Sequence, residues 1–366
     1  MGGLHPESYI SRLQVRQRIS RAQPKGLPII NMGFNEMPYP PPQSVVEAIS
    51  GRALFAHRYG SAACNALRQA LALEHELPAE QLICGNGSEE LIDVVGRCFV
   101  RPGDGIVISE YGYIQFSMIA HRLGAKLKKA PEARFTAQAD SILAAVDQNT
   151  KLIYLANPNN PTGTLMAAEE VARLAGALPG NVVLVLDLAY GEFVGEDYCQ
   201  RMHALVGAHE NVVVTRTFSK VYGLAGVRIG WCHAPTWMMG GLSAARGMGS
   251  VNGYAERAAL AALGEQNTLR ARVRELLNER GKMFDALSAT ALNVVQSQTN
   301  FIMCGVPDEN PALVDALVGY LFDEAGIVVG PVREEGLGGF VRFSLSLPEH
   351  NALALDVVRA FLEQRV

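Results

Sequence analysis

Short apolar runs alternate with segments of helical periodicity through the first two thirds of the chain. The apolar runs lie at residues 81–84, 106–109, 151–156, 182–186 and 211–214. Nearly continuous runs of this kind are typical of parallel strands that are buried on both faces. Helical spacing of apolar residues is found at residues 45–54, 65–76, 91–99, 114–123 and 167–177. The pattern therefore predicts an α/β fold with a mostly parallel sheet.

The C-terminal part of the chain has a different pattern. Residues 238–254 are rich in glycine, serine and methionine and predict a loop or an interface, and residues 255–284 predict one long helix that could kink near Gly264. Shorter strands and helices follow, which predict a second, smaller α+β domain. At the other end, a helix or arm is expected at residues 8–20, before an extended, proline-rich segment at residues 29–42.

Composition and charge favour small molecules as partners. A formal net charge of −4, with no stripe of lysine and arginine, gives no electrostatic footprint for nucleic acid. The six cysteines have no CxxC spacing, which suits free thiols in a reducing compartment. The N-terminal residues lack the features of a secretion signal, and no apolar run approaches the ~20 residues that span a bilayer. We therefore expect a cytoplasmic protein that binds neither nucleic acid nor a membrane.

Polar residues follow most of the predicted strands directly. In open sheets of this type ligands bind beyond the carboxyl ends of the strands, so these residues are expected to share one site. They are Gly87, Ser88, Glu89, Tyr111, Asn160, Asp187, Tyr190 and Lys220. Cys199 and His203 have the spacing of a metal-ligand pair on a helix, but no second pair completes a ligand set, so no metal is expected.

Two of these features indicate that the site binds charged groups. The glycine-bearing turn at residues 85–89 leads into a helix and could hold a phosphate on its free N–H groups, although an ordinary strand-to-helix turn would look the same. It is neither a Walker loop nor GxGxxG, which disfavours ATP and dinucleotides. Asp187 closes an aliphatic run, where a carboxylate needs a cationic or protonated partner. A helix N-cap or a structural ion pair is the alternative for Asp187.

Lys220 ends the string Thr217-Phe-Ser-Lys220, just after a predicted strand. Most loop lysines are solvated surface charges. Together with a buried aspartate, a phosphate-binding turn and an aromatic face, however, this lysine suits pyridoxal phosphate. The lysine amine forms a Schiff base with that cofactor, and the aspartate keeps its pyridine nitrogen protonated so that the ring can withdraw electrons.

Four motifs in order carry a specific resemblance. They are Asn159-Asn-Pro-Thr-Gly163, Asp187-Leu-Ala-Tyr190-Gly-Glu-Phe193, Thr217-Phe-Ser-Lys220 and Gly226-Val-Arg228-Ile-Gly230. From about residue 29 to its C-terminus the chain resembles the aspartate aminotransferase superfamily, the class I/II pyridoxal phosphate enzymes of fold type I, in its histidinol-phosphate aminotransferase-like branch. The resemblance implies a large domain with a mostly parallel seven-stranded sheet at residues 36–264 and a small α+β domain at 265–366. Residues 1–35 would form an N-terminal arm that adds to the small domain.

The resemblance also implies how the cofactor is held. Lys220 would carry the cofactor and move the proton at the substrate's α-carbon, and Asp187 would pair with the pyridine nitrogen. Asn160 and Tyr190 would bind the phenolic oxygen, and Tyr111 would stack on the ring. The residues expected around the phosphate are Gly87, Ser88, Glu89, Thr217 and Arg228, with Tyr59 reaching it from the other subunit of an obligatory homodimer.

For the substrate, the resemblance implies a carboxylate clamp and one departure from the family pattern. Arg342 matches the arginine that binds the α-carboxylate bidentately, and Asn35 and Glu36 lie in the segment that crosses the substrate mouth. Gly330 stands where histidinol-phosphate aminotransferases typically have an arginine for the substrate phosphate, and Arg333 is displaced from that position. We therefore expect a substrate other than histidinol phosphate.

These inferences predict an aminotransferase that works by a ping-pong mechanism between an amino acid and a 2-oxo acid. The same cofactor residues also serve decarboxylases, lyases and cyclases, because the reaction depends on which bond at the α-carbon stands perpendicular to the ring. A non-catalytic protein of this fold is the alternative from another class. Such proteins usually carry a DNA-binding module or lose a cofactor residue, and neither feature is found here.

Overall fold

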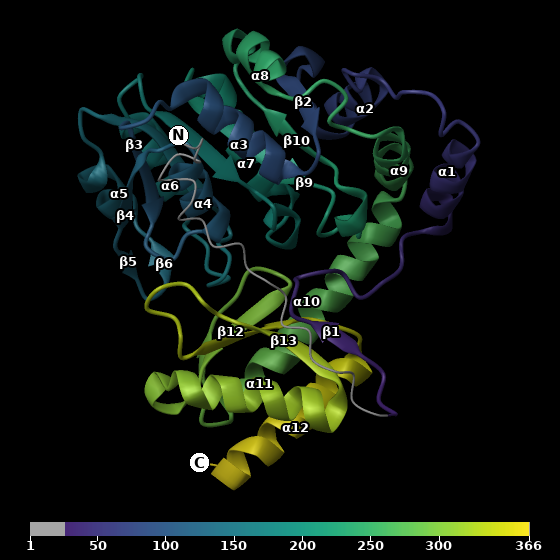
Figure 1. Ribbon diagram of the computed structural model, residues 1–366, viewed down its shortest axis with the longest axis vertical. Helices are drawn as coiled ribbons and strands as arrows, with labels where there is room; N and C mark the ends of the chain where they lie inside the picture. The colour runs from purple at the N-terminus through teal and green to yellow at the C-terminus, as the bar shows by residue number, and fades with distance from the viewer. Residues whose placement is uncertain (1–25, 366) are drawn as a thin grey trace, which may run out of the picture.

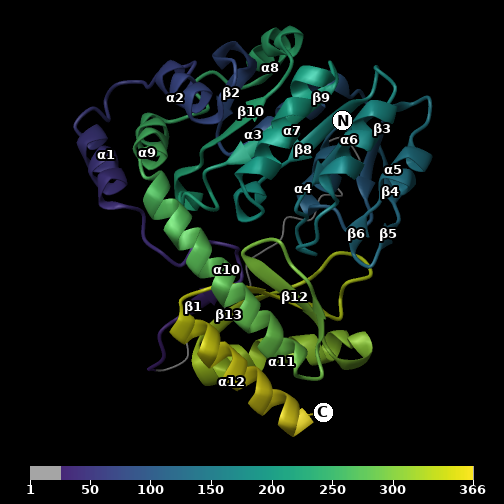
Figure 2. The same cartoon turned by 180° about the vertical axis from the view of Figure 1, so that it is seen from behind.

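The computed structural model describes residues 26–365, so the helix or arm expected at residues 8–20 lies outside the described residues. Two large sheets carry the fold, with helices on both faces of the larger one (Figures 1 and 2), and β5 (Glu132–Ala133) and β6 (Thr136–Ala137) form a third, two-stranded sheet. The strand order of the larger sheet is β2-β10-β9-β8-β7-β3-β4. Its strands are β2 (Leu82–Gly85), β3 (Gly105–Ser109), β4 (Lys126–Ala130), β7 (Thr150–Ala156), β8 (Val183–Asp187), β9 (Val212–Thr217) and β10 (Gly230–His233).

The larger sheet is mostly parallel, as the apolar runs predict. Only β10 runs antiparallel to its neighbours among the strands of this sheet. The pattern did not predict β10 or the edge strand β4, whose sequence Lys126-Leu-Lys-Lys-Ala130 is largely charged. Lysines are typical of an exposed edge, where they discourage pairing with another chain.

Both faces of this sheet are buried, which explains the apolar runs. Leu184 and Leu186 face one hydrophobic cluster, which includes residues of α6 and α7, whereas Val183 and Val185 face a second cluster with residues of α3 and α4. The helices around this sheet are α1 (Gln43–Ala53), α2 (Asn65–His75), α3 (Ser88–Phe99), α4 (Ile114–Arg122), α5 (Ala139–Ala145), α6 (Ala168–Ala177), α7 (Glu196–Ala208), α8 (Met239–Ala245) and α9 (Gly253–Leu263).

The smaller sheet has the order β1-β13-β14-β12-β11 and packs against α10, α11 and α12 (Figure 1). These elements are β1 (Ile30–Met32), β11 (Asn293–Val295), β12 (Phe301–Gly305), β13 (Ile327–Pro331), β14 (Phe340–Ser344), α10 (Gln266–Ser288), α11 (Pro311–Ala325) and α12 (Pro348–Arg365). Because β1 pairs in parallel with β13, the segment before the large sheet belongs structurally with the C-terminal part of the chain. The segment after β1 brings Asn35 to Lys220 and Tyr190, which follow strands of the larger sheet.

Two predicted elements differ from the structure. The single helix expected at residues 255–284 is two helices, α9 and α10, because α9 ends at Leu263 with Gly264 as its C-cap. The loop expected at residues 238–254 contains the short helix α8, which packs on α3. The glycines of this segment do not favour a helix, but α8 packs through its buried Leu242, next to Met238 of the preceding turn.

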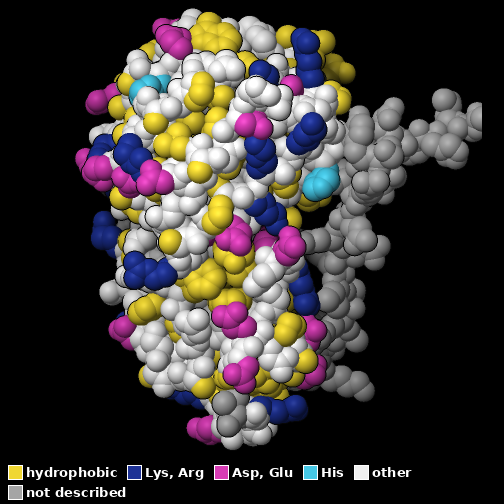
Figure 3. Space-filling model, turned by 90° about the vertical axis from the view of Figure 1, so that its left-hand side faces the viewer, with side chains coloured by type: hydrophobic (Ala, Val, Ile, Leu, Met, Phe, Trp, Pro, Cys, Tyr) yellow, Lys and Arg dark blue, Asp and Glu magenta, His cyan; other side chains and the backbone are white. Residues whose placement is uncertain are grey.

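The surface carries charges of both signs. On the face over α5 and β4, lysine and arginine side chains are interspersed with acidic and apolar ones (Figure 3). Among residues 26–365, no helix is both long and apolar enough to cross a membrane. All six cysteines are free thiols.

Candidate active site

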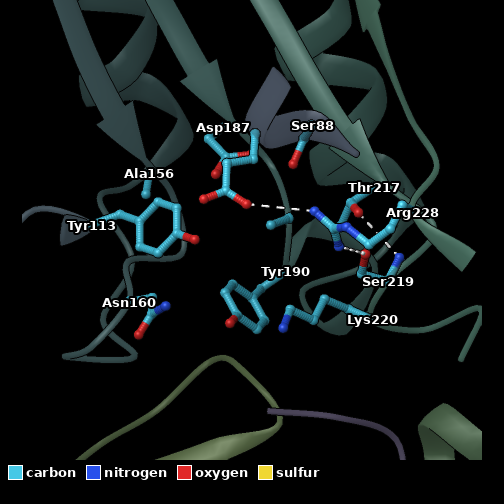
Figure 4. A pocket seen from close by; sticks show the side chains of 12 residues that line it. Ser88, Tyr113, Ala156, Asn160, Asp187, Tyr190, Thr217, Ser219, Lys220 and Arg228 are labelled. Carbon is cyan, nitrogen blue, oxygen red and sulfur yellow. Dashed lines mark hydrogen bonds and ion pairs between the residues drawn. The ribbon is translucent and has the colours of Figure 1, made fainter. Parts of the chain in front are cut away.

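A pocket lies at the carboxyl ends of β7, β8 and β9, facing the smaller sheet (Figure 4). Its empty volume is about 570 Å³, including its open mouth. Its lining residues are Ser88, Glu89, Tyr113, Ala156, Asn160, Asp187, Ala189, Tyr190, Thr217, Ser219, Lys220 and Arg228. The structure therefore brings together most of the residues that the sequence places after separate strands.

Asp187 forms the deep wall of this pocket. It ends β8 and is only 4% exposed. Burial raises the pKa of its carboxyl from 3.8 to about 6, while the Thr215 hydroxyl, the backbone N–H of Ala189 and the charge of Lys220 act in the opposite direction. A carboxylate in this position gains most from a cationic group that enters the pocket and pairs with it.

Lys220 faces Asp187's pocket from the loop after β9. Its Nζ donates a hydrogen bond of 3.2 Å to the backbone oxygen of Asn35 and lies 5.5 Å from the centre of the Tyr190 ring. The loop is held tightly, because the Ser219 N–H donates to Thr217 Oγ1 at 3.1 Å and the Gly223 N–H to the Lys220 carbonyl at 2.8 Å. The amine is thus presented to the pocket by an ordered turn.

An anion cradle lies on the opposite side of the pocket from Tyr113 and Asn160 (Figure 4). Ser88 and Glu89 begin α3, whose N-terminus has no side-chain cap, so its first N–H groups and the positive end of its dipole face the pocket. Arg228 contacts Ser219 Oγ at 3.5 Å and Glu89 at 3.4 Å. Gly87 has φ +88°, and a Cβ there would lie 2.7 Å from the Arg228 guanidinium.

The structure places Tyr113 on the pocket wall, where the sequence predicted Tyr111. Tyr111 packs instead against Phe135, in a cluster with residues of the smaller domain such as Phe340. Tyr113 precedes α4, and its ring packs edge-on against Phe116. Burial raises the pKa of the Tyr113 hydroxyl. The sequence does contain this second tyrosine, two residues after Tyr111 in the same loop, so Tyr113 could have been considered as the stacking residue.

Ser219 is a second lining residue that was not predicted from the sequence. Its hydroxyl lies between Thr217 and Lys220 in the recognised string and contacts Arg228. The sequence pattern that could have indicated Ser219 is the presence of hydroxyl side chains both three positions and one position before the lysine. Thr215 was also missed, because nothing in a buried strand distinguishes a threonine that binds a neighbouring carboxylate from one that only packs.

The expected substrate residues lie at different distances from the pocket. Arg342 on β14 contacts Asn160 Oδ1 and donates to the Gly33 carbonyl at 3.1 Å, so it borders the site through Asn160. Asn35 is buried and binds Tyr190 and Lys220. Glu36 is exposed and accepts a 2.7 Å hydrogen bond from Asn31, outside the lining of the pocket.

Tyr59 is fully exposed, at 103% of its reference area, and does not line this chain's own pocket. It lies in the segment between α1 and α2, beside the exposed Leu54 and Phe55. A role for Tyr59 at the cofactor would therefore require another subunit.

The residues of this pocket fit pyridoxal phosphate. The buried carboxylate of Asp187 suits a protonated pyridine nitrogen, the uncapped N-terminus of α3 with Arg228 suits a phosphate, and Lys220 offers an amine between them. A Cβ at Gly230 would overlap the backbone nitrogen of Ser88, so β10 and the start of α3 approach closely only with glycine there. Fold and donor set together define an enzyme of pyridoxal phosphate fold type I.

Comparison with known proteins gives the family. The chain belongs to the family "Aminotransferase class I and II", whose model matches residues 28–357. A histidinol-phosphate aminotransferase from Ruegeria pomeroyi is 38% identical over 92% of this chain and 92% of its own length, and one from Granulibacter bethesdensis is 34% identical over 92% and 90%. The protein is thus an aminotransferase, an enzyme that uses pyridoxal phosphate.

A solved structure supports the same conclusion. The histidinol-phosphate aminotransferase of Sinorhizobium meliloti, in complex with pyridoxal-5'-phosphate, is 28% identical, covers 98% of both chains and superposes with a TM-score of 0.89. The L-threonine-O-3-phosphate decarboxylase of Porphyromonas gingivalis shares the fold at 21% identity and a TM-score of 0.78. The names of the aminotransferase relatives do not support the expectation that histidinol phosphate is excluded as a substrate.

The structure shows what surrounds Gly330, the position that departs from the family pattern. A Cβ at Gly330 would lie 3.1 Å from the Gly33 carbonyl oxygen and 3.4 Å from Arg342 Nη2. The neighbouring Arg333 points elsewhere and forms a 2.8 Å ion pair with Asp315 at the surface. Arg342 is thus the arginine that the structure places beside Asn160 at the site.

Proposed function

We propose that the enzyme transfers an amino group from an amino acid to a 2-oxo acid by a ping-pong mechanism, with both substrates using the pocket at Lys220. The observation that carries this proposal is the convergence of Lys220, Asp187 and the N-terminus of α3 on one pocket, with Arg342 at its border. Bound there, pyridoxal phosphate supplies an electron sink for the bonds at the substrate's α-carbon.

Each side chain of the pocket has its own proposed role. Lys220 would hold the cofactor through Nζ and, as a free amine, would move a proton between the substrate's α-carbon and the cofactor's C4′. Asp187 would keep the pyridine nitrogen in its charged form. Asn160 and Tyr190 would bind the phenolic oxygen, and Tyr113 would offer its ring for stacking.

Arg342 binds the α-carboxylate of the substrate. Its guanidinium lies 5.2 Å from the centre of the Phe301 ring and is held by Asn160 and Gly33, so its plane is set before a carboxylate arrives. We propose an unphosphorylated amino acid as the natural donor. Gly330 supports this proposal, because no side chain at that position supplies a charge for a substrate phosphate, whereas the relatives' names favour histidinol phosphate.

A panel of donors and acceptors tests both parts of the proposal. Purified holoenzyme is mixed with single amino acids or histidinol phosphate, and conversion of the cofactor to its amine form is followed by absorbance. Release of carbon dioxide or ammonia without that conversion would show a decarboxylase or lyase instead. A kcat/KM for histidinol phosphate above that for every amino acid would overturn the proposed donor and leave transamination intact.

We also propose an obligatory homodimer in which Tyr59 reaches the phosphate of the other subunit. Leu54 and Phe55, a few residues before Tyr59, are exposed by 78% and 55%, and Met248 by 95%, and such apolar side chains could add area to the contact. Inactive K220A and Y59A proteins are unfolded and refolded together. Restored activity is expected, because one site of each mixed dimer then has both residues, and no restoration would contradict the exchange of Tyr59.

A further inference from the structure

Asn35 joins the two chemically important side chains of the pocket to the smaller sheet. It is 2% exposed, and its backbone has a left-handed φ of +55°, a conformation in which asparagine is one of the few tolerated residues. Its backbone oxygen accepts hydrogen bonds from Lys220 Nζ and from Asn300 Nδ2, each at 3.2 Å. Its side-chain Nδ2 donates to the Tyr190 hydroxyl at 2.8 Å.

Ser344 determines which way the amide of Asn35 faces. The Asn35 N–H donates to Ser344 Oγ at 2.8 Å, so the Ser344 hydroxyl is free to donate its own proton, and it does so to Asn35 Oδ1 at 3.1 Å. In this arrangement Oδ1 faces Ser344 and Nδ2 faces Tyr190. An amide nitrogen can only donate, so the Tyr190 oxygen must accept this bond.

The direction of that bond sets the direction of the Tyr190 proton. A phenol that accepts from Asn35 cannot donate back along the same line, and its O–H is left to point elsewhere. Tyr190 and Lys220 lie together at the edge of the pocket nearest the smaller sheet (Figure 4), and the Tyr190 hydroxyl is expected beside the cofactor's phenolic oxygen. The proton then points at that oxygen.

We propose that Asn35 is a positioning residue: it makes Tyr190 a hydrogen-bond donor into the pocket and holds the Lys220 amine beside it. This inference rests on the proposed role of Tyr190 at the cofactor. It differs from the expectation that Asn35 contacts the substrate, because both of its polar side-chain atoms are engaged by Ser344 and Tyr190. Its effect should appear in the acidity of the bound cofactor.

The test is an isosteric reversal of this bond. Asn35→Asp keeps the size and the tolerated backbone but replaces the donor with an acceptor, so the Tyr190 proton turns away from the pocket. Holoenzymes are titrated with pH while the absorbance of the bound cofactor is recorded, with Asn35→Asp made alone and together with Tyr190→Phe. Asn300→Asp, alone and with Tyr190→Phe, is the control, since it places the same charge next to the Asn35 backbone.

We expect Asn35→Asp to raise the midpoint of the absorbance titration by about one pH unit, a tenfold change in the proton equilibrium. More than half of that shift should disappear in the Tyr190→Phe background, whereas the shift from Asn300→Asp should be the same in both backgrounds. Equal shifts of Asn35→Asp with and without the tyrosine would overturn the proposal. If Asn35→Asp does not fold, Ser344→Ala removes the hydroxyl that orients the amide, and its shift should likewise depend on Tyr190.

The comparison of absorbance titrations between the single and double variants, which forms a double-mutant cycle, does not require turnover. If the wild-type enzyme binds the cofactor but transaminates no donor, the proposed function fails while the Asn35–Tyr190 coupling can still be measured. If the enzyme transaminates but the cycle shows no coupling, the positioning role fails alone.

Discussion

Thr215 Oγ1 donates a 3.0 Å hydrogen bond to Asp187 Oδ1, and the two residues pair directly on the neighbouring strands β8 and β9. The backbone N–H of Ala189 also contacts the carboxyl. These donors orient a carboxylate that burial alone would tend to neutralise. The sheet itself therefore positions the acid that is expected to pair with the cofactor's nitrogen.

Asp187 should make the cofactor-free protein less stable as the pH rises. Its pKa of about 6 in the folded state, against 3.8, means that the folded protein keeps a proton that the unfolded chain has lost. Stability from this group is therefore present below the unfolded pKa and falls by about 3 kcal/mol as the pH rises through the folded pKa. In urea denaturation of the apoprotein, Asp187→Asn should be more stable than the wild type above pH 6 and bind the cofactor more weakly.

Thr215→Val provides the matched control for this prediction. It keeps the shape but removes the hydroxyl that lowers the pKa of Asp187, so the loss of apoprotein stability should be larger than in the wild type. A stability difference between wild type and Asp187→Asn that does not change between pH 4 and 7 would contradict the role of burial.

Tyr113 and Tyr111 should differ in their effect on cofactor binding. Tyr113→Ala removes a ring from the pocket wall and should raise the dissociation constant of pyridoxal phosphate by about tenfold, the value of one stacking contact. Tyr111→Ala removes a ring that packs on Phe135, so it should lower thermal stability more than cofactor affinity. Fluorescence titration of both apoproteins measures the two constants, and equal losses of affinity would contradict the assignment.

The sequence predicted the parts of the site that depend on strand ends. Asp187 and Lys220 each follow an apolar run, and parallel strands bring their carboxyl ends to one edge, so their meeting could be foreseen. Tyr111 and Tyr113 share one loop, and only the packing of Tyr113 on Phe116 decides which ring enters the pocket. In a loop, unlike a strand, the pattern of apolar and polar residues does not predict which way a side chain points.

Elements without an apolar pattern were harder to predict. The edge strand β4 is mostly lysine, and β10 is short and antiparallel, so neither resembles a buried parallel strand. The hydrogen bonds of Asn35 could not be predicted from the sequence either. They join Asn35 to Tyr190, which is 155 positions away, and to Ser344, which is 309 positions away. Such contacts depend on how the segment that carries Asn35 lies between Ser344 on β14 and the Tyr190 loop after β8.

Arg342 should be the arginine that matters for substrate carboxylates. Arg342→Lys keeps the charge but loses the planar pair of donors, so kcat/KM for amino acids should fall by roughly 10- to 100-fold, mostly through KM. Arg333→Lys is the control, because Arg333 pairs with Asp315 at the surface and should leave both constants unchanged. Steady-state kinetics with one donor and one 2-oxo acid measures both variants. Similar losses in the two would show that the carboxylate is bound elsewhere.

The buried ion pair between Arg216 and Glu192 should be important for stability. Arg216 on β9 is 1% exposed, and its Nη2 lies 2.8 Å from Glu192 Oε1, in the short helix that follows Tyr190. The pair thus ties the strand that precedes Lys220 to the segment that carries Tyr190. Glu192→Gln leaves a buried guanidinium without its counter-charge and should lower the free energy of unfolding by about 3 kcal/mol.

Urea denaturation of the holoenzyme measures this loss, with Glu169→Gln as the control. Glu169 pairs with Arg201 at 2.6 Å, but both side chains are exposed to solvent, so water replaces the lost partner. No measurable change is expected for Glu169→Gln. Because Arg216 also stacks on Trp231 at 5.5 Å, part of its environment survives the loss of Glu192, and the variant should still fold. Equal stability of Glu192→Gln and the wild type would mean that this packing alone compensates the buried charge.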